Sequence, residues 1–290
     1  MMEPLIRNVL CAHPGGLHRM AYREWRPAGE ERRTVVCVHG LTRTGGDFDR
    51  LAETLAGDGF RVVCPDMAGR GLSDRLPAAA LYDIPQYVAD CTTLLARLDR
   101  ERFDWVGTSM GGMIGMSLAS LAGHPIGRLF VNDIGPVLSR AGLERISGYV
   151  GDTSCYPDFA SAEAALRTRM ASFGPHTDKE FRLLSRHHFV EREEGWFAHY
   201  DPAIAEAFAE LPVTDVGSWP LWRAIDCPVT VLRGAEADLL DASTAELMTR
   251  GGPEGDGPRA VLETVAGVGH APTLIRDDQL EVVRRFLLGG

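Results

Sequence analysis

The sequence predicts an α/β protein in which a doubly wound, mostly parallel sheet carries an inserted helical lid. Short continuous apolar runs alternate with helical patterns along the chain, and this alternation stops between about residues 138 and 222. Continuous apolar strands are typical of a parallel sheet covered on both faces. We therefore expect a sheet domain built from residues 1–137 and 223–290, with residues 138–222 inserted as a helical lid.

The predicted strands are short and end at polar residues or glycines. Residues 18–25 alternate between apolar and polar side chains, which predicts a strand with one exposed face. Six continuous apolar runs predict buried strands at 34–38, 61–64, 103–106, 128–131, 229–232 and 260–265.

Helical patterns fill the intervals between these strands. In the sheet domain we expect helices at 47–56, 84–97, 112–121 and 279–288. Pro85 lies in the first turn of the second helix, where proline is tolerated because a backbone N–H has no hydrogen-bond partner within the helix. The interrupted region has no strong strand pattern and contains helical stretches at 161–173, 178–189 and 203–211.

Composition excludes several classes of protein. The 290 residues carry 30 Lys and Arg against 40 Asp and Glu, a net charge of −10, which argues against a nucleic-acid binder. The apolar runs are far shorter than the roughly 20 residues of a membrane span. Glu3 and Pro4 interrupt any secretory signal. Six cysteines without zinc spacing predict a reduced, cytoplasmic protein.

The motif Gly107-Thr-Ser-Met-Gly111 follows a predicted strand and opens a predicted helix. A sharp strand-to-helix turn of this kind exposes the serine at its apex, and small residues two positions before and after allow the turn to close. Ser109 then projects from the carboxyl edge of the sheet, where doubly wound folds bind ligands. We expect Ser109 to be a nucleophile.

Three further motifs follow predicted strands in the order typical of one family. His39-Gly40-Leu41, the segment 66–73 and Gly267-Val-Gly-His270, together with Ser109, resemble the α/β-hydrolases over nearly the whole chain. The chain looks most like lid-bearing ester, enol-lactone and carbon–carbon bond hydrolases. It departs from the dehalogenases and epoxide hydrolases, which carry aspartate at the position of Ser109.

The resemblance implies a catalytic triad in the chain order serine, acid, histidine, which selects His270 as the base. For the acid, Glu236, Asp238 and Asp241 follow the strand at 229–232, and the family pattern favours Asp238. Asp133, at the end of the preceding strand, is the alternative.

The resemblance also implies an oxyanion hole made by the backbone amides of Leu41 and Met110. Their side chains should line the acyl pocket, which favours an apolar acyl group. His39 in the same loop is expected to be structural. Arg43 either pairs with a substrate carboxylate at the mouth of the pocket or is a solvated loop residue.

The aromatic residues of the insertion are expected to divide into two groups. Trp219 and Trp222, near the return to the sheet, should be packing residues. At least one of four others should face the pocket above Ser109, and these are Tyr149, Phe159, Phe173 and Trp196.

We therefore expect a serine hydrolase that cleaves an ester, thioester or lactone through an acyl-enzyme on Ser109. Carbon–carbon bond hydrolysis and acyl transfer use the same residues and remain alternatives. A non-catalytic ligand-binding protein is a further alternative, from a different class of function. The expected partner is a small-molecule acyl substrate. No cofactor or metal is implied, since His187, His188 and His199 lack a metal-ligand spacing, and no feature predicts an oligomeric state.

Overall fold

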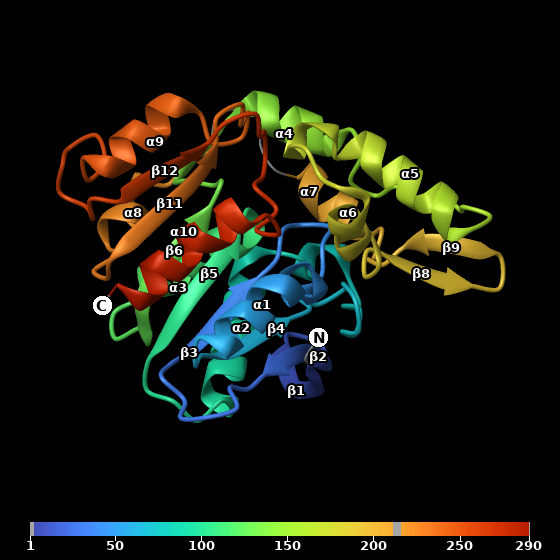
Figure 1. The fold of residues 1–290 in the computed structure, drawn as a ribbon, viewed down its shortest axis with the longest axis horizontal. Helices are drawn as coiled ribbons and strands as arrows, with labels where there is room; N and C mark the ends of the chain where they lie inside the picture. Colours follow the sequence, from blue (N-terminus) through green and yellow to red (C-terminus); the bar gives the residue numbers. More distant parts are fainter. Residues whose placement is uncertain (1–2, 211–215, 290) are drawn as a thin grey trace.

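The computed structural model describes residues 3–210 and 216–289, and a central sheet organises the fold (Figure 1). The eight strands of this sheet are β1 (Leu5–His13), β2 (Gly16–Trp25), β3 (Thr34–Val38), β4 (Arg61–Pro65), β5 (Phe103–Thr108), β6 (Ile126–Asn132), β11 (Val229–Gly234) and β12 (Val261–Val265). Their spatial order is β1-β2-β4-β3-β5-β6-β11-β12. The pairs from β4 to β12 are parallel, whereas β1 and β2 are antiparallel additions at one edge.

The predicted α/β class is confirmed, and each predicted strand is present within two residues of its expected ends. Strand β1 was not predicted. It lies at the edge of the sheet, and its large side chains Leu5, Ile6 and Leu10 are at least half exposed. An edge strand that buries only part of one face carries no continuous apolar run, so its sequence lacks the pattern of a buried strand.

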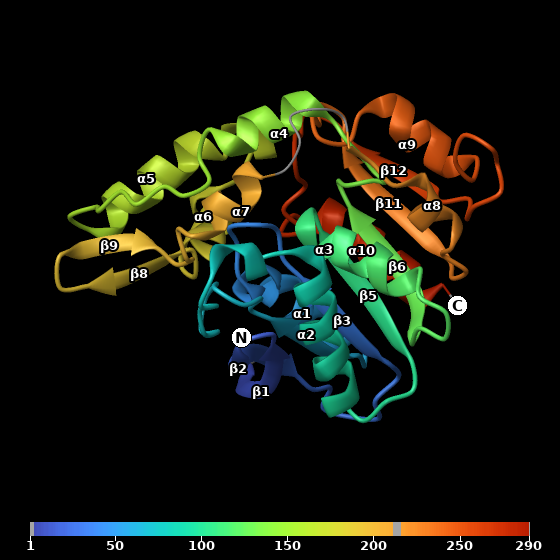
Figure 2. The ribbon, with the colours of Figure 1, turned by 180° about the vertical axis from the view of Figure 1, so that it is seen from behind.

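Helices cover both faces of the sheet (Figures 1 and 2). Helices α1 (Asp49–Gly57) and α10 (Asp277–Leu288) pack on one face, where Leu51 and Val283 belong to one buried cluster. Helices α2 (Ile84–Arg97) and α3 (Met110–Ala119) pack on the other face. Two more helices, α8 (Trp219–Arg223) and α9 (Ala242–Thr249), add to this second face, and α9 was not predicted.

The described residues between β6 and α8 form a separate layer above the sheet (Figure 1). Its elements are the short strands β7 (Val137–Leu138) and β10 (Val216–Gly217), the helices α4 (Arg140–Ser147), α5 (Phe159–Arg169), α6 (Asp178–Ser185) and α7 (Ile204–Ala209), and the hairpin strands β8 (Phe189–Arg192) and β9 (Gly195–Ala198). Short 3₁₀ helices also lie at Gly45–Phe48, Ala79–Leu81 and Ala171–Phe173.

The β8–β9 hairpin corrects the expectation of a purely helical insertion. Both strands are short, and Glu191, Arg192, Glu193 and Glu194 are exposed, so the segment has no apolar run that would predict a strand. The predicted helix at 178–189 accordingly ends at Ser185. Of the predicted helix at 203–211, residue 211 lies outside the described residues.

A small buried cluster lies mostly in the insertion, where it includes Leu166, Phe181 and Leu184, and Ile275 of the sheet domain also belongs to it. The last helix of the region, α8, contacts α3 of the sheet domain instead. Trp222 is fully buried in the main core, and Trp219 packs against it, so both residues have the packing role that was expected. Within the described parts of the chain, we find no helix whose length and apolar character would let it cross a membrane.

Candidate active site

Ser109 lies at the turn between β5 and α3 in a strained backbone conformation. Its φ of 51° and ψ of −116° are unusual for a residue with a side chain. The neighbouring glycines make the turn possible, because a Cβ atom on Gly107 would lie 2.2 Å from the Gly111 oxygen, and one on Gly111 would lie 1.9 Å from the Val38 oxygen. The motif therefore holds the Ser109 hydroxyl at the carboxyl end of the sheet.

An unbroken chain of hydrogen bonds begins at this hydroxyl. Ser109 Oγ lies 3.0 Å from Nε2 of His270, and Nδ1 of His270 lies 2.8 Å from Oδ2 of Asp133. The other carboxylate oxygen of Asp133 accepts a hydrogen bond of 2.8 Å from the backbone N–H of Gly234. A carboxylate that holds Nδ1–H leaves Nε2 free to accept the Ser109 proton, so this arrangement can generate a nucleophilic alkoxide.

The placement of Asp133 corrects the expectation that Asp238 orients His270. Asp238 instead accepts two hydrogen bonds from Arg145 of α4, at 2.5 and 2.9 Å. Burial alone would raise the pKa of Asp238, but the hydrogen bonds and charge of Arg145 outweigh burial and hold that pKa below its usual value. Asp238 therefore ties the segment after β11 to the insertion, whereas Asp133, which follows the neighbouring strand β6, reaches the imidazole.

Two residues beside Ser109 have backbone amides without a partner among the described residues: Met110 follows it in the chain, and Leu41 lines the same cavity. Met110 is the first residue of α3, so its N–H has no partner within the helix. No residue in the described part of the chain accepts a hydrogen bond from the amide of Leu41. These are the amides that were expected to form the oxyanion hole, and they remain free for a ligand oxygen.

A buried arginine lies beneath these two residues and was not recognised in the sequence. Arg70 is 1% exposed and donates hydrogen bonds to the Leu41 carbonyl oxygen at 2.8 Å and to Sδ of Met110 at 3.5 Å. Its guanidinium also lies over the rings of Tyr82 and Tyr87. Among the described residues no carboxylate contacts Arg70. In the sequence Arg70 stands between Gly69 and Gly71, which both have a positive φ in the structure, and this pattern indicated only a tight loop.

His39 fixes the loop that carries Leu41. The Met67 N–H donates to its Nε2 at 2.9 Å, so its Nδ1–H must donate to the Gly40 oxygen at 2.8 Å. Burial lowers the pKa of His39 to about 3, which keeps the ring neutral. This position agrees with the structural role expected for His39.

A small cavity of about 70 Å³, partly open to solvent, lies over Ser109. Its walls come from the loop after β3, from the end of β5, from the loop after β12, and from the insertion. Of the predicted substrate-binding residues, Arg43, Tyr149 and Phe173 line this cavity. The insertion adds five residues that were not predicted: Ile146, Leu166, Arg169, Met170 and His188.

Phe159 and Trp196 do not line the cavity, which corrects the expectation for these two residues. Their rings pack edge to face with centroids 5.0 Å apart, and Phe159 also packs against Phe189. They hold the β8–β9 hairpin against α5. The side chain of Leu41 lines the cavity as expected, whereas that of Met110 points to Arg70 instead.

Arg43 lines the cavity, but all five of its N–H groups already have acceptors. Nε and Nη2 donate to the Asp47 carboxylate, Nη2 also to the Leu184 oxygen, and Nη1 to Met170 Sδ and to His188 Nδ1. A guanidinium has no further N–H to offer. Arg43 therefore joins the loop after β3 to the insertion and has no donor left for a substrate carboxylate, contrary to the first of its two expected roles.

A larger hollow lies elsewhere, between β2, α1 and α6. Charged side chains such as Arg23, Asp49 and Glu180 line it, and it includes none of the three residues linked to Ser109 by hydrogen bonds. We therefore place the candidate active site in the smaller cavity, where a nucleophile and its base meet.

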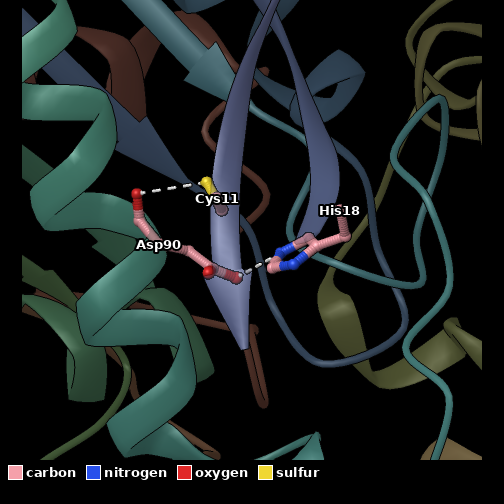
Figure 3. Close-up of side chains that lie close together, drawn as sticks. All are labelled: Cys11, His18 and Asp90. Atoms are coloured by element: carbon pink, nitrogen blue, oxygen red, sulfur yellow. Dashed lines mark hydrogen bonds and ion pairs between the residues drawn. The ribbon is translucent and has the colours of Figure 1, made fainter. Parts of the chain in front are cut away.

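Figure 3 shows the group of potential metal ligands that the described residues bring together: Cys11, His18 and Asp90. The Asp90 carboxylate receives hydrogen bonds from His18 Nε2 at 3.0 Å and Gln86 Nε2 at 2.8 Å. Burial and the Asp90 charge raise the pKa of the Cys11 thiol to about 12. These contacts fasten the β1–β2 hairpin to α2, and β1 lies four strands from β5. His187, His188 and His199 form no such group.

Comparisons with known proteins show which family the chain resembles. The model of the alpha/beta hydrolase family matches residues 35–285. A 3-hydroxybutyrate-oligomer hydrolase from Cupriavidus necator is 44% identical over 298 residues and spans 99% of both chains.

Two solved structures also cover essentially the whole chain. An alpha/beta hydrolase from Novosphingobium aromaticivorans is 36% identical, with a TM-score of 0.87 over 99% of both chains. A hydrolase from Rickettsia typhi is 28% identical, with a TM-score of 0.88 over 100% of both chains. The chain therefore belongs to the alpha/beta hydrolase family and is an ester-acting enzyme of that family.

Proposed function

We propose that this enzyme cleaves a carboxylic ester by a serine mechanism in which Ser109 is the nucleophile, His270 the general base and Asp133 the acid that orients His270. The observation that carries the proposal is the continuous hydrogen-bond chain from Ser109 through His270 to Asp133 at the floor of a cavity. Asp133 is fully buried and also held by the Gly234 amide, so it is a fixed partner for the imidazolium.

The reaction proceeds in two halves. His270 Nε2 takes the hydroxyl proton as Ser109 Oγ attacks the ester carbon, and the amides of Leu41 and Met110 stabilise the oxyanion. His270 then returns the proton to the departing alcohol, leaving an acyl-enzyme. A water molecule then gives a proton to His270 and attacks the acyl carbon; the bond to Ser109 Oγ breaks, His270 returns the proton to that oxygen, and the acid leaves.

The substrates we propose are short oligomers of 3-hydroxybutyrate, in which each ester joins the carboxyl group of one hydroxy acid to the hydroxyl group of the next. The 44% identity over the whole length to an enzyme named for this substrate supports the proposal. The chemical character of the cavity wall also supports the proposal. This wall combines apolar side chains, among them Leu41, Leu166 and Phe173, with the polar groups of His188 and Arg169.

Residues 138–222 act in this proposal as a lid on a core formed by residues 1–137 and 223–290. Residues of α4 and α5 form the cavity wall opposite Ser109, and Arg43 and Asp238 bind the insertion to the core. A lid of this kind excludes water from the substrate until the acyl-enzyme has formed. We also propose a cytoplasmic location, which is supported by the six free cysteines.

The test is hydrolysis of the purified linear 3-hydroxybutyrate dimer and trimer, followed by chromatography of the released monomer. We expect turnover of both, and of 4-nitrophenyl butyrate, with loss of all three activities in Ser109→Ala. Turnover of 4-nitrophenyl butyrate without any turnover of the dimer or trimer would disprove the substrate and keep the mechanism.

A further inference from the structure

His188 places a buried nitrogen without a partner in the wall of the cavity over Ser109. The side chain is 3% exposed, and Nε2 has no hydrogen-bond partner among the described residues. A buried polar atom without a partner costs free energy in the empty protein, which a ligand atom at the same place would recover. The ring belongs to the cavity wall, so the missing partner can be part of a substrate.

Arg43 determines whether His188 Nε2 is a hydrogen-bond donor or acceptor, and therefore whether the substrate must supply an acceptor or a donor. Arg43 Nη1 lies 3.1 Å from His188 Nδ1, and a guanidinium can only donate. Nδ1 is therefore the acceptor, and a neutral ring carries its proton on Nε2. Burial, together with the charges of Arg43 and Arg169, holds the pKa of His188 well below its usual value, so the ring is neutral at physiological pH. Nε2–H is thus a donor that requires an acceptor.

Arg169 adds a positive charge to the same wall. Its Nη2 donates to Asp152, and its guanidinium lies 5.9 Å from the centre of the Tyr149 ring. In contrast to Arg43, the groups Nε and Nη1 of Arg169 donate to no described residue. Two kinds of donor, one neutral and one charged, therefore remain available in a wall that is otherwise largely apolar.

We propose that His188 and Arg169 form a subsite for the free carboxylate at the end of a substrate oligomer, on the alcohol side of the ester that Ser109 cleaves. This inference rests on the proposed function. A carboxylate has two oxygens and accepts from both donors, and Arg169 favours its charge. A hydroxyl group would accept from His188 but would gain little from Arg169.

The subsite gives the enzyme a way to recognise the end of a chain. An oligomer whose terminal carboxylate is held by the lid presents its last ester bond to Ser109, and each turnover releases one 3-hydroxybutyrate. A long polymer has few such ends, so a carboxylate subsite selects short oligomers. Apolar esters without a carboxylate use only the apolar part of the cavity.

The test compares two forms of the 3-hydroxybutyrate dimer, the free acid and its methyl ester, by kcat/KM for the internal ester bond. We expect wild type to prefer the free acid by about tenfold or more, the size typical of hydrogen bonds to a charged group. His188→Phe and Arg169→Gln should each reduce this preference by about tenfold. Because the preference is a ratio within one variant, a change in overall activity does not affect it.

Arg167→Gln is the matched control. Arg167 lies on the same helix, is 41% exposed and pairs with Asp178 outside the cavity, so its loss should leave the preference unchanged. A third substrate, the dimer without the 3-hydroxyl on its acyl half, tests the competing acceptor. If His188→Phe changes discrimination of this hydroxyl and not of the carboxylate, the proposal is wrong.

The outcomes separate this inference from the proposed function. Wild-type enzyme that cleaves the acid and its methyl ester equally well contradicts the carboxylate subsite and leaves the proposed function intact. Enzyme that cleaves neither dimer contradicts the proposed function itself. If His188→Phe does not fold, Arg169→Gln decides: an unchanged preference in that variant overturns the subsite.

Discussion

Replacing Asp133 by asparagine tests the triad with the smallest change in shape. The carboxylate now accepts two hydrogen bonds, one from the Gly234 amide and one from His270 Nδ1. Asparagine has one acceptor oxygen and one donor NH₂ group. With its oxygen toward Gly234, its NH₂ group faces His270 and forces the ring proton onto Nε2. That tautomer cannot accept the proton of Ser109.

The alternative orientation of the amide is unfavourable. Its NH₂ group would then oppose the Gly234 N–H in a site where residue 133 is fully buried, at a cost of about 1–3 kcal/mol for the unsatisfied donors. The first orientation therefore dominates. In serine hydrolases with this geometry the wrong tautomer lowers kcat by about 10⁴-fold, which corresponds to about 5.5 kcal/mol. We expect a loss of this size in Asp133→Asn.

The assay is kcat for 4-nitrophenyl butyrate, with circular dichroism to confirm the fold. Asp238→Asn is the matched control, because it makes the same chemical change at the carboxylate that binds Arg145. We expect that variant to keep activity within about tenfold of wild type. A larger loss in Asp238→Asn than in Asp133→Asn would refute our assignment of the acid.

Three further predictions concern the surroundings of the triad. Ser109→Ala should lower kcat by about 10⁴-fold or more with little change in melting temperature. Arg70→Met should lower kcat by about tenfold while changing KM less, because Arg70 supports the residues whose amides stabilise the oxyanion; equal effects on both constants would argue against this. The pKa of His39 is about 3 when folded and about 6.5 when unfolded, so as pH falls His39 is protonated in the unfolded chain before it is protonated in the folded protein. Stability should therefore fall by about 1.4 kcal/mol per pH unit for this residue as pH drops from about 6.5 towards 3; urea unfolding of His39→Gln should show a shallower fall.

The sequence predicted the sheet and the sharp turn that carries Ser109 well because local signals specify both. Buried parallel strands appear in a sequence as continuous apolar runs. The turn at Ser109 requires small residues at fixed positions, because a larger side chain there would clash with the neighbouring backbone. His270 follows a strand at the end of the chain and is flanked by a glycine and an alanine, so its position was also local information.

The acid could not be predicted in the same way. Asp133 and Asp238 follow adjacent parallel strands, so both lie at the same edge of the sheet. The two carboxylates differ in their hydrogen-bond partners. Arg145, which binds Asp238, belongs to the insertion and lies nearly a hundred residues away in the sequence. A pairing across that separation leaves no local pattern in a single sequence.

The wall of the cavity was predicted only in part for a related reason. Aromatic content indicated that the insertion has apolar surfaces, but did not show which surface each ring would cover. Tyr149 and Phe173 line the cavity, whereas Phe159 and Trp196 stabilise a hairpin that has no apolar run. His188 owes its free donor to the distant Arg43, a contact that exists only in the folded chain.

The most direct test of the central claim is intact-protein mass spectrometry of enzyme quenched in acid during turnover of the 3-hydroxybutyrate dimer, followed by peptide mapping. Our account predicts a covalent adduct with the mass of one 3-hydroxybutyryl group, located on Ser109 and absent from Ser109→Ala. An adduct on another residue, or dimer hydrolysis at the wild-type rate by Ser109→Ala, would contradict it.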